Sequence, residues 1–178
     1  MIKLKLFSKE WNNDIFIHDL RKPLPWKSNN VDIIYSSHTL EHLTKEQGKK
    51  ILKECHRILK KDGILRIIVP DLRKIVDNYI SGEIQADEFF DKLGVINDYE
   101  GNKLKSRLAC LFGFPHRCMY DDEGLLTVLE DAGFKGELRN PFESEIVDIS
   151  AIELDSRTKN SVIVECQKKN IPSDKKLN

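Results

Sequence analysis

The sequence predicts an α/β domain built on a doubly wound, mainly parallel sheet with an antiparallel final strand. Two apolar runs, residues 31–37 and 64–69, flank a segment whose apolar residues recur at helical spacing. Both runs contain consecutive apolar residues, a pattern typical of strands that are covered on both faces of a parallel sheet. The chain has 178 residues, enough for one domain with a buried core.

The N-terminal part predicts three strands. In residues 2–6 apolar residues alternate with lysines, which indicates a short edge strand. Residues 15–18 predict a second short strand that ends at Asp19, before a turn-rich stretch with two prolines. The strand over 31–37 follows and ends in polar residues.

The predicted crossover helix begins at a capping box, Thr44-Lys45-Glu46-Gln47. We expect Gly63 to end this helix as its C′ residue. The strand over 64–69 follows, with Arg66 as its one charged residue, and Pro70 ends it.

The C-terminal half predicts helices and two closing strands. We expect helices over 72–80 and 104–111, with a partly helical insertion between them over 83–102. Asp121 is placed to cap a further helix, and residues 134–139 and 161–166 predict the last two strands. One domain would therefore occupy residues 1–168, and the lysine-rich residues 169–178 would be a disordered tail.

Composition narrows the class of protein. The 29 basic and 29 acidic residues balance, which argues against a nucleic-acid binder. The four cysteines are scattered without a C-x-x-C pair, which favours reduced thiols in a cytoplasmic protein. The chain contains no apolar run of transmembrane length, and its start does not have the pattern of a signal peptide. We therefore expect no membrane partner.

Five stretches, in this order, resemble class I S-adenosylmethionine-dependent methyltransferases, and most closely the type 11 group of small-molecule enzymes. They are D-L-R-K-P-L-P-W (19–26), V-D-I-I-Y-S-S-H-T-L-E-H-L (31–43), E-C-H-R-I-L-K-K-D-G-I-L-R-I-I-V-P-D-L (54–72), H-R-C-M-Y-D-D-E-G-L-L-T-V-L-E-D-A-G-F (116–134) and S-V-I-V-E-C-Q-K (161–168). The resemblance implies a Rossmann-like methyltransferase fold and S-adenosylmethionine as the cofactor. It also implies a small-molecule acceptor, such as a sugar or a polysaccharide precursor.

The resemblance also assigns roles to residues. Those expected to bind the cofactor are Asp19 and Leu20, near the adenine, and Ser36 and Ser37, near its methionine part. The candidate catalytic bases are His38 and His42, because imidazole titrates near neutral pH. For both histidines a structural role remains the alternative. The residues expected to face the acceptor are Glu41, Asp71, His116, Arg117 and Tyr120.

One feature departs from the family. No glycine precedes Gly48, so the glycine-rich turn that normally approaches the cofactor is missing, and the N-terminal part of the fold is expected to be truncated. The alternative function is therefore a non-catalytic methyltransferase-like interaction module that has lost its cofactor. Association into a homo-oligomer would cover the apolar faces exposed by the missing strands. A domain that binds a nucleotide sugar at the same strand ends is a third hypothesis.

Residues 38–42 also spell H-x-x-E-H, the inverted zincin motif. Zinc binding by that motif requires both histidines on one face of a helix. The predicted strand over 31–37 instead places His38 at a strand end, so the sequence predicts no metal site. Glu41 is expected to be solvated or locally hydrogen-bonded.

Overall fold

The structure is a computed structural model that describes residues 16–95 and 115–168. Its sheet has four strands in the order β1-β2-β4-β3. They are β1 (Val31–Ser37), β2 (Leu59–Pro70), β3 (Phe134–Leu138) and β4 (Ser161–Lys168). β1 pairs with β2 in parallel, and β4 runs antiparallel to both β2 and β3. The expected sheet, parallel apart from its final strand, is confirmed.

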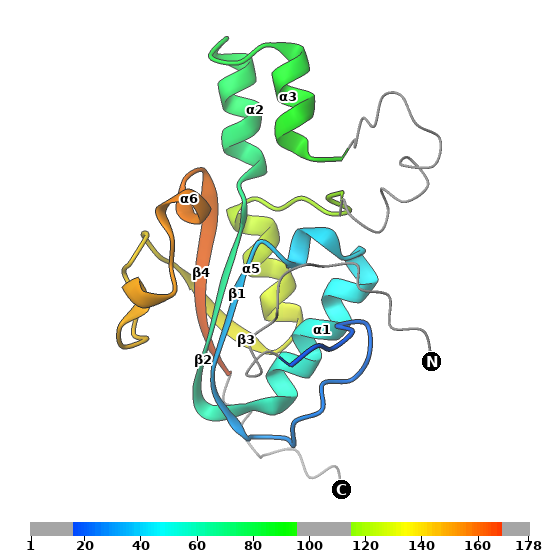
Figure 1. Cartoon of the computed structure of the whole chain (residues 1–178), viewed down its shortest axis with the longest axis vertical. Coiled ribbons are helices and arrows are strands. Elements are labelled where there is room, and N and C mark those ends of the chain that lie inside the picture. Colours follow the sequence, from blue (N-terminus) through cyan, green and yellow to red (C-terminus); the bar gives the residue numbers. More distant parts are fainter. Residues whose placement is uncertain (1–15, 96–114, 169–178) are drawn as a thin grey trace, which may run out of the picture.

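Helices and loops cover both faces of this sheet (Figure 1). On one face lie α1 (Lys45–Ile58) and α5 (Asp122–Asp131). On the other lies the segment between β3 and β4, which contains η2 (Ile149–Ala151) and α6 (Asp155–Thr158). α2 (Leu72–Ile80) and α3 (Ala86–Leu93) form a hairpin beyond the end of β2, where the rings of Tyr79 and Phe89 pack with their centroids 4.9 Å apart.

The apolar core lies between the sheet and the face that carries α1 and α5. Alternate residues of β2, namely Leu65, Ile67 and Val69, are buried there because successive side chains of a strand point to opposite faces. The predicted apolar stripe of α1 meets them with Ile51, Leu52, Cys55 and Ile58. Burial raises the pKa of the Cys55 thiol to about 12, so this thiol stays protonated at neutral pH.

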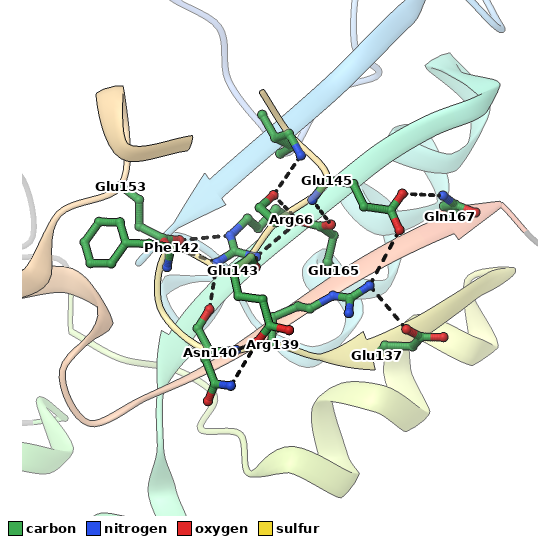
Figure 2. A network of polar contacts seen from close by, with 12 residues as sticks. Arg66, Glu137, Arg139, Asn140, Phe142, Glu143, Glu145, Glu153, Glu165 and Gln167 are labelled. Carbon is green, nitrogen blue, oxygen red and sulfur yellow. Dashed lines mark hydrogen bonds and ion pairs between the residues drawn. The ribbon is translucent and has the colours of Figure 1, made fainter. Parts of the chain in front are cut away.

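The opposite face of β2 carries a charged residue, Arg66, between the apolar residues Ile64 and Ile68. Arg66 is fully buried and forms ion pairs with Glu153, in the loop before α6, and with Glu165 on β4 (Figure 2). This cluster fixes the segment between β3 and β4 against the sheet. Arg66, the one charged residue of the apolar run 64–69, is thus the centre of a buried ionic network.

The capping box of α1 is confirmed. The backbone N–H of Gln47 donates to the hydroxyl of Thr44, and the backbone N–H of Thr44 donates to the Gln47 side chain. Replacing Thr44 by alanine leaves the Gln47 N–H without this partner, so we expect a loss of about 1 kcal/mol of unfolding free energy. Urea unfolding of Thr44→Ala and of Thr127→Ala, an exposed threonine within α5, measures the difference; an equal loss in both would contradict it.

Three expectations about local structure are wrong. Residues 16–18 form no strand, because β1 has no partner at its outer edge within the described ranges. Ile33 on that edge strand is 44 % exposed, so β1 is not covered on both faces. Gly63 does not end α1 but lies inside β2, where a Cβ atom would stand 2.8 Å from the carbonyl oxygen of Asp32. It is needed for the close approach of two strands.

Some expected elements lie outside the described residues: the strand over 2–6, the helix over 104–111, and the tail over 169–178. The insertion after α2 is confirmed as helical over Ala86–Leu93.

Within the described ranges, no helix has the length and apolar character needed to cross a membrane. Cys55, Cys118 and Cys166 are all free thiols, as expected.

Candidate functional site

The candidate site lies where β1 ends, at the carboxyl edge of the parallel pair. The chain turns sharply at His38, which has a φ of 49° and whose N–H donates to the carbonyl oxygen of Ile68 at 2.9 Å. A positive φ is rare for a residue other than glycine and is found preferentially at functional sites. The turn leads into η1 (Leu40–His42), so the residues of the H-x-x-E-H motif do not share one α-helix.

A segment from a distant part of the sequence closes over η1. The carbonyl oxygen of Glu41 accepts hydrogen bonds from the backbone N–H groups of Arg117 at 2.7 Å and Cys118 at 3.1 Å. The backbone N–H of His116 donates to the carbonyl oxygen of Gly94 at 2.8 Å. These bonds place His116 beside η1.

Glu41 is buried completely, which contradicts the expectation of a solvated side chain. Among the described residues, neither of its carboxylate oxygens has a hydrogen-bond partner. The Nδ1 atom of His38 lies 3.4 Å from Oε1, and the Nε2 atom of His42 lies 3.8 Å from the same oxygen. The expectation failed because the burial of Glu41 depends on the 115–118 segment, which is remote in the sequence.

The ring of His38 is held from both sides. Its Nε2 atom lies 2.8 Å from the carbonyl oxygen of Arg157, so this nitrogen carries a proton and donates. The nearby carboxylate of Glu41 raises the pKa of the His38 imidazole above its ordinary value. Whether His38 or His42 acts as a catalytic base stays a prediction.

A cavity of about 710 Å³ runs along β1 and beneath α1, and Ser36 and Ser37 line it. This volume lies within the range of small-molecule sites. The lining is apolar over most of its extent, with Trp26 and Leu20 at its wall, and the described residues that line it include no charged side chain. The hydroxyl groups of Ser36, Ser37 and Thr39 supply polar atoms near the end of the strand.

The cavity fits S-adenosylmethionine in part. Its apolar wall suits an adenine ring, and its hydroxyl groups can donate to the carboxylate of the methionine part. A charged partner for the ribose is not among the lining residues. Asp19, expected near the adenine, instead pairs with Arg21 at 2.8 Å, and this pairing lowers the pKa of the Asp19 carboxyl to about 2. Leu20 does line the cavity.

The remaining expected acceptor residues take different positions. Asp71 caps α2, where its carboxylate accepts from the backbone N–H of Lys74 at 3.1 Å. Tyr120 forms an isolated bridge with Asp71 and is buried, which raises the pKa of its hydroxyl. Arg117 is exposed. The structure thus gathers His38, Glu41, His42 and His116, while Asp71 and Tyr120 join the neighbouring chain segments.

Comparison with known proteins supports the same family. Residues 3–67 match the sequence model of a family described as "Methyltransferase domain". No curated protein matches the chain in sequence. The match includes β1, α1 and most of β2, which form the unit that carries the candidate site. The match covers 65 of the 178 residues and agrees with the resemblance to class I methyltransferases found in the sequence.

A solved structure with a TM-score above 0.5 shares the fold. A protein of Pyrococcus horikoshii is 17 % identical, with a TM-score of 0.51, over 86 % of this chain and 58 % of the other. A putative methyltransferase of Haloferax volcanii, solved in complex with the Trm112 methyltransferase activator, is 12 % identical with a TM-score of 0.49, over 86 % and 60 %. A possible histamine N-methyltransferase of Thermotoga maritima is 20 % identical with a TM-score of 0.45, over 85 % and 62 %. The chain spans about 60 % of the length of these proteins.

Proposed function

We propose that this chain, which has the fold and a sequence match of class I methyltransferases, transfers a methyl group from S-adenosylmethionine to a small-molecule acceptor. A hydroxyl group of a sugar or of a polysaccharide precursor is the acceptor that we favour. The observation that carries the proposal is the cavity of about 710 Å³ beside the carboxyl end of β1, at the strand edge where open α/β sheets bind ligands.

In methyl transfer the main task of the protein is to align the acceptor oxygen with the methyl group of the cofactor. The bound cofactor supplies a methyl group on a positively charged sulfur. As the acceptor oxygen forms its bond to the methyl carbon, the carbon–sulfur bond breaks and its electron pair stays on sulfur. The hydroxyl proton must leave, and our candidate to receive it is His38, which lies between the cavity-lining residues Ser37 and Thr39 in the sequence. Ser36 and Ser37 would hold the methionine part in line.

Calorimetric titration of the purified chain tests this proposal. We expect one molecule of S-adenosylhomocysteine to bind per chain and to raise the melting temperature, because a ligand that binds only the folded state stabilises it. Adenosine alone, which lacks the methionine part, is the matched control ligand and should bind more weakly. A chain that binds neither S-adenosylmethionine nor S-adenosylhomocysteine would contradict the proposal.

One observation favours the second candidate, an interaction module without activity. The outer edge of β1 has no partner strand within the described ranges, and the cavity beside it is mostly apolar. An open strand edge beside an apolar groove is a site for pairing with a second copy of the chain. Light scattering distinguishes the two: a dimer that binds no cofactor supports the module, whereas a monomer that binds cofactor supports the enzyme.

A further inference from the structure

We propose that Glu41, His42 and His116 bind a divalent transition cation at the carboxyl edge of β1. Each of these residues offers one ligand atom, and the three atoms lie within 4.8 Å of one another. Glu41 and His42 come from η1, and His116 comes from the segment before α5. The sequence predicts no metal site, so this proposal departs from that expectation.

The first argument is the buried carboxylate. Glu41 has no exposed surface, and within residues 16–95 and 115–168 both of its oxygens lack hydrogen-bond partners. A buried carboxylate is costly unless it is paired, hydrogen-bonded or bound to a metal. The nearest imidazole nitrogens, on His38 and His42, stand 3.4 Å and 3.8 Å from Oε1, which is longer than a charge-assisted hydrogen bond. A cation at this point would satisfy the carboxylate.

The second argument is the orientation of His116. Its Nδ1 atom lies 2.8 Å from the carbonyl oxygen of Leu93, so Nδ1 carries the proton and donates it. The Nε2 atom therefore presents a lone pair. Metal-binding histidines are commonly fixed in this way, with one nitrogen donating to a carbonyl and the other free to coordinate. The ring of His116 packs 5.0 Å from that of His42, centroid to centroid.

The third argument is the position of the cluster, which is set by the backbone. His116 is tied to Gly94, and the carbonyl oxygen of Glu41 holds the N–H groups of Arg117 and Cys118. The three side chains are thus supported before any ligand arrives. Preorganised side chains of this kind bind a cation with little loss of conformational freedom.

The donor set indicates the class of cation. Two imidazole nitrogens and one carboxylate oxygen suit Zn²⁺, Fe²⁺ or Mn²⁺ better than Mg²⁺ or Ca²⁺, which prefer oxygen ligands. Three protein ligands leave a coordination position open, as in catalytic metal sites. If the proposed methyl transfer is correct, an acceptor hydroxyl bound there would lose its proton more easily. Only that consequence rests on the proposed function.

The test is metal binding by the full chain without a histidine tag. After treatment with a chelator and dialysis, calorimetry with Zn²⁺ should show one site per chain, and Mg²⁺ should bind at least about 100-fold more weakly. Glu41→Gln and His116→Gln should each weaken Zn²⁺ binding at least about 100-fold, since loss even of an outer partner costs 10- to 100-fold. His18→Gln is the control and should bind normally, because the His18 ring stacks on Phe16 and lies 3.1 Å from the carbonyl oxygen of Pro23, and it is not part of the cluster.

Folding is measured separately. The melting temperature of each metal-free variant should stay near that of the metal-free parent, and Zn²⁺ should raise it in the parent and in His18→Gln only. Equal Zn²⁺ affinity in the parent, Glu41→Gln and His116→Gln would overturn the site. Equal affinity for Mg²⁺ would overturn the cation class. Failure to bind S-adenosylhomocysteine in the separate titration would contradict the proposed function and leave the cation site standing.

Discussion

Replacing Arg66 by methionine is expected to lower the free energy of unfolding by about 3–5 kcal/mol, a large part of the stability of an ordinary domain. The loss is large because the substitution leaves two buried carboxylates without their guanidinium partner. Glu153 and Glu165 are both buried, and without the guanidinium their carboxylates lose the only cationic partner that they have in the described part of the chain. An uncompensated buried charge costs far more than the pair contributes when intact.

The geometry of Arg66 explains the size of this effect. Its five N–H groups are all used: three donate to Glu153 and Glu165, and two donate to the carbonyl oxygens of Asn140 and Glu143 (Figure 2). The surplus negative charge of the two carboxylates is met by the backbone N–H groups of Phe142 and Glu145 and by the hydroxyl of Ser144. Arg66→Met therefore also releases the backbone of the segment that covers this face of the sheet.

Urea unfolding monitored by circular dichroism measures the loss. The control is Arg73→Met, because the ion pair of Arg73 with Asp121, at 3.2 Å, lies at the surface and should matter by less than about 1 kcal/mol. The triple variant Arg66→Met, Glu153→Leu, Glu165→Leu removes all three charges and should recover part of the loss. Equal stability of Arg66→Met and Arg73→Met would contradict this account of the network.

The sequence predicted most of the fold, because the elements concerned are set by local signals. The capping box at Thr44 and the capping residue Asp121 place two helices, and the apolar runs place β1 and β2. Gly63 was misplaced because a glycine after a helical pattern usually ends a helix. Its actual requirement is a contact with Asp32, in another strand, which spacing along the chain does not reveal.

The candidate site was predicted less well, for a related reason. The motif around His38 correctly indicated a strand end, and the loops carrying Asp71 and His116 were expected nearby. The burial of Glu41 was missed because it arises from hydrogen bonds to Arg117 and Cys118, some 76 residues along the chain. The only local signal is a carboxylate between two histidines, in a motif whose zinc-binding form requires an α-helix that this segment does not have.

Filling the cavity beside β1 should abolish most cofactor affinity without harming the fold. Ser36 lines the cavity, and its neighbours there are largely apolar, so a leucine at this position enters surroundings that accept it. A ligand that uses the same space must then move or be excluded. We expect Ser36→Leu to weaken S-adenosylhomocysteine binding by about 10- to 100-fold, which corresponds to about 1–3 kcal/mol.

Calorimetry measures the affinity of Ser36→Leu for the ligand, and the melting temperature shows whether the variant is folded. The matched control is Ser150→Leu, an exposed serine in η2 on the other face of the sheet, which should bind as the parent does. Because leucine adds apolar burial at Ser36, the melting temperature of Ser36→Leu should equal or exceed that of the parent, and weak binding then reflects the blocked cavity. Unchanged affinity in Ser36→Leu would place the cofactor elsewhere, since the carboxyl end of β1 could no longer hold its methionine part.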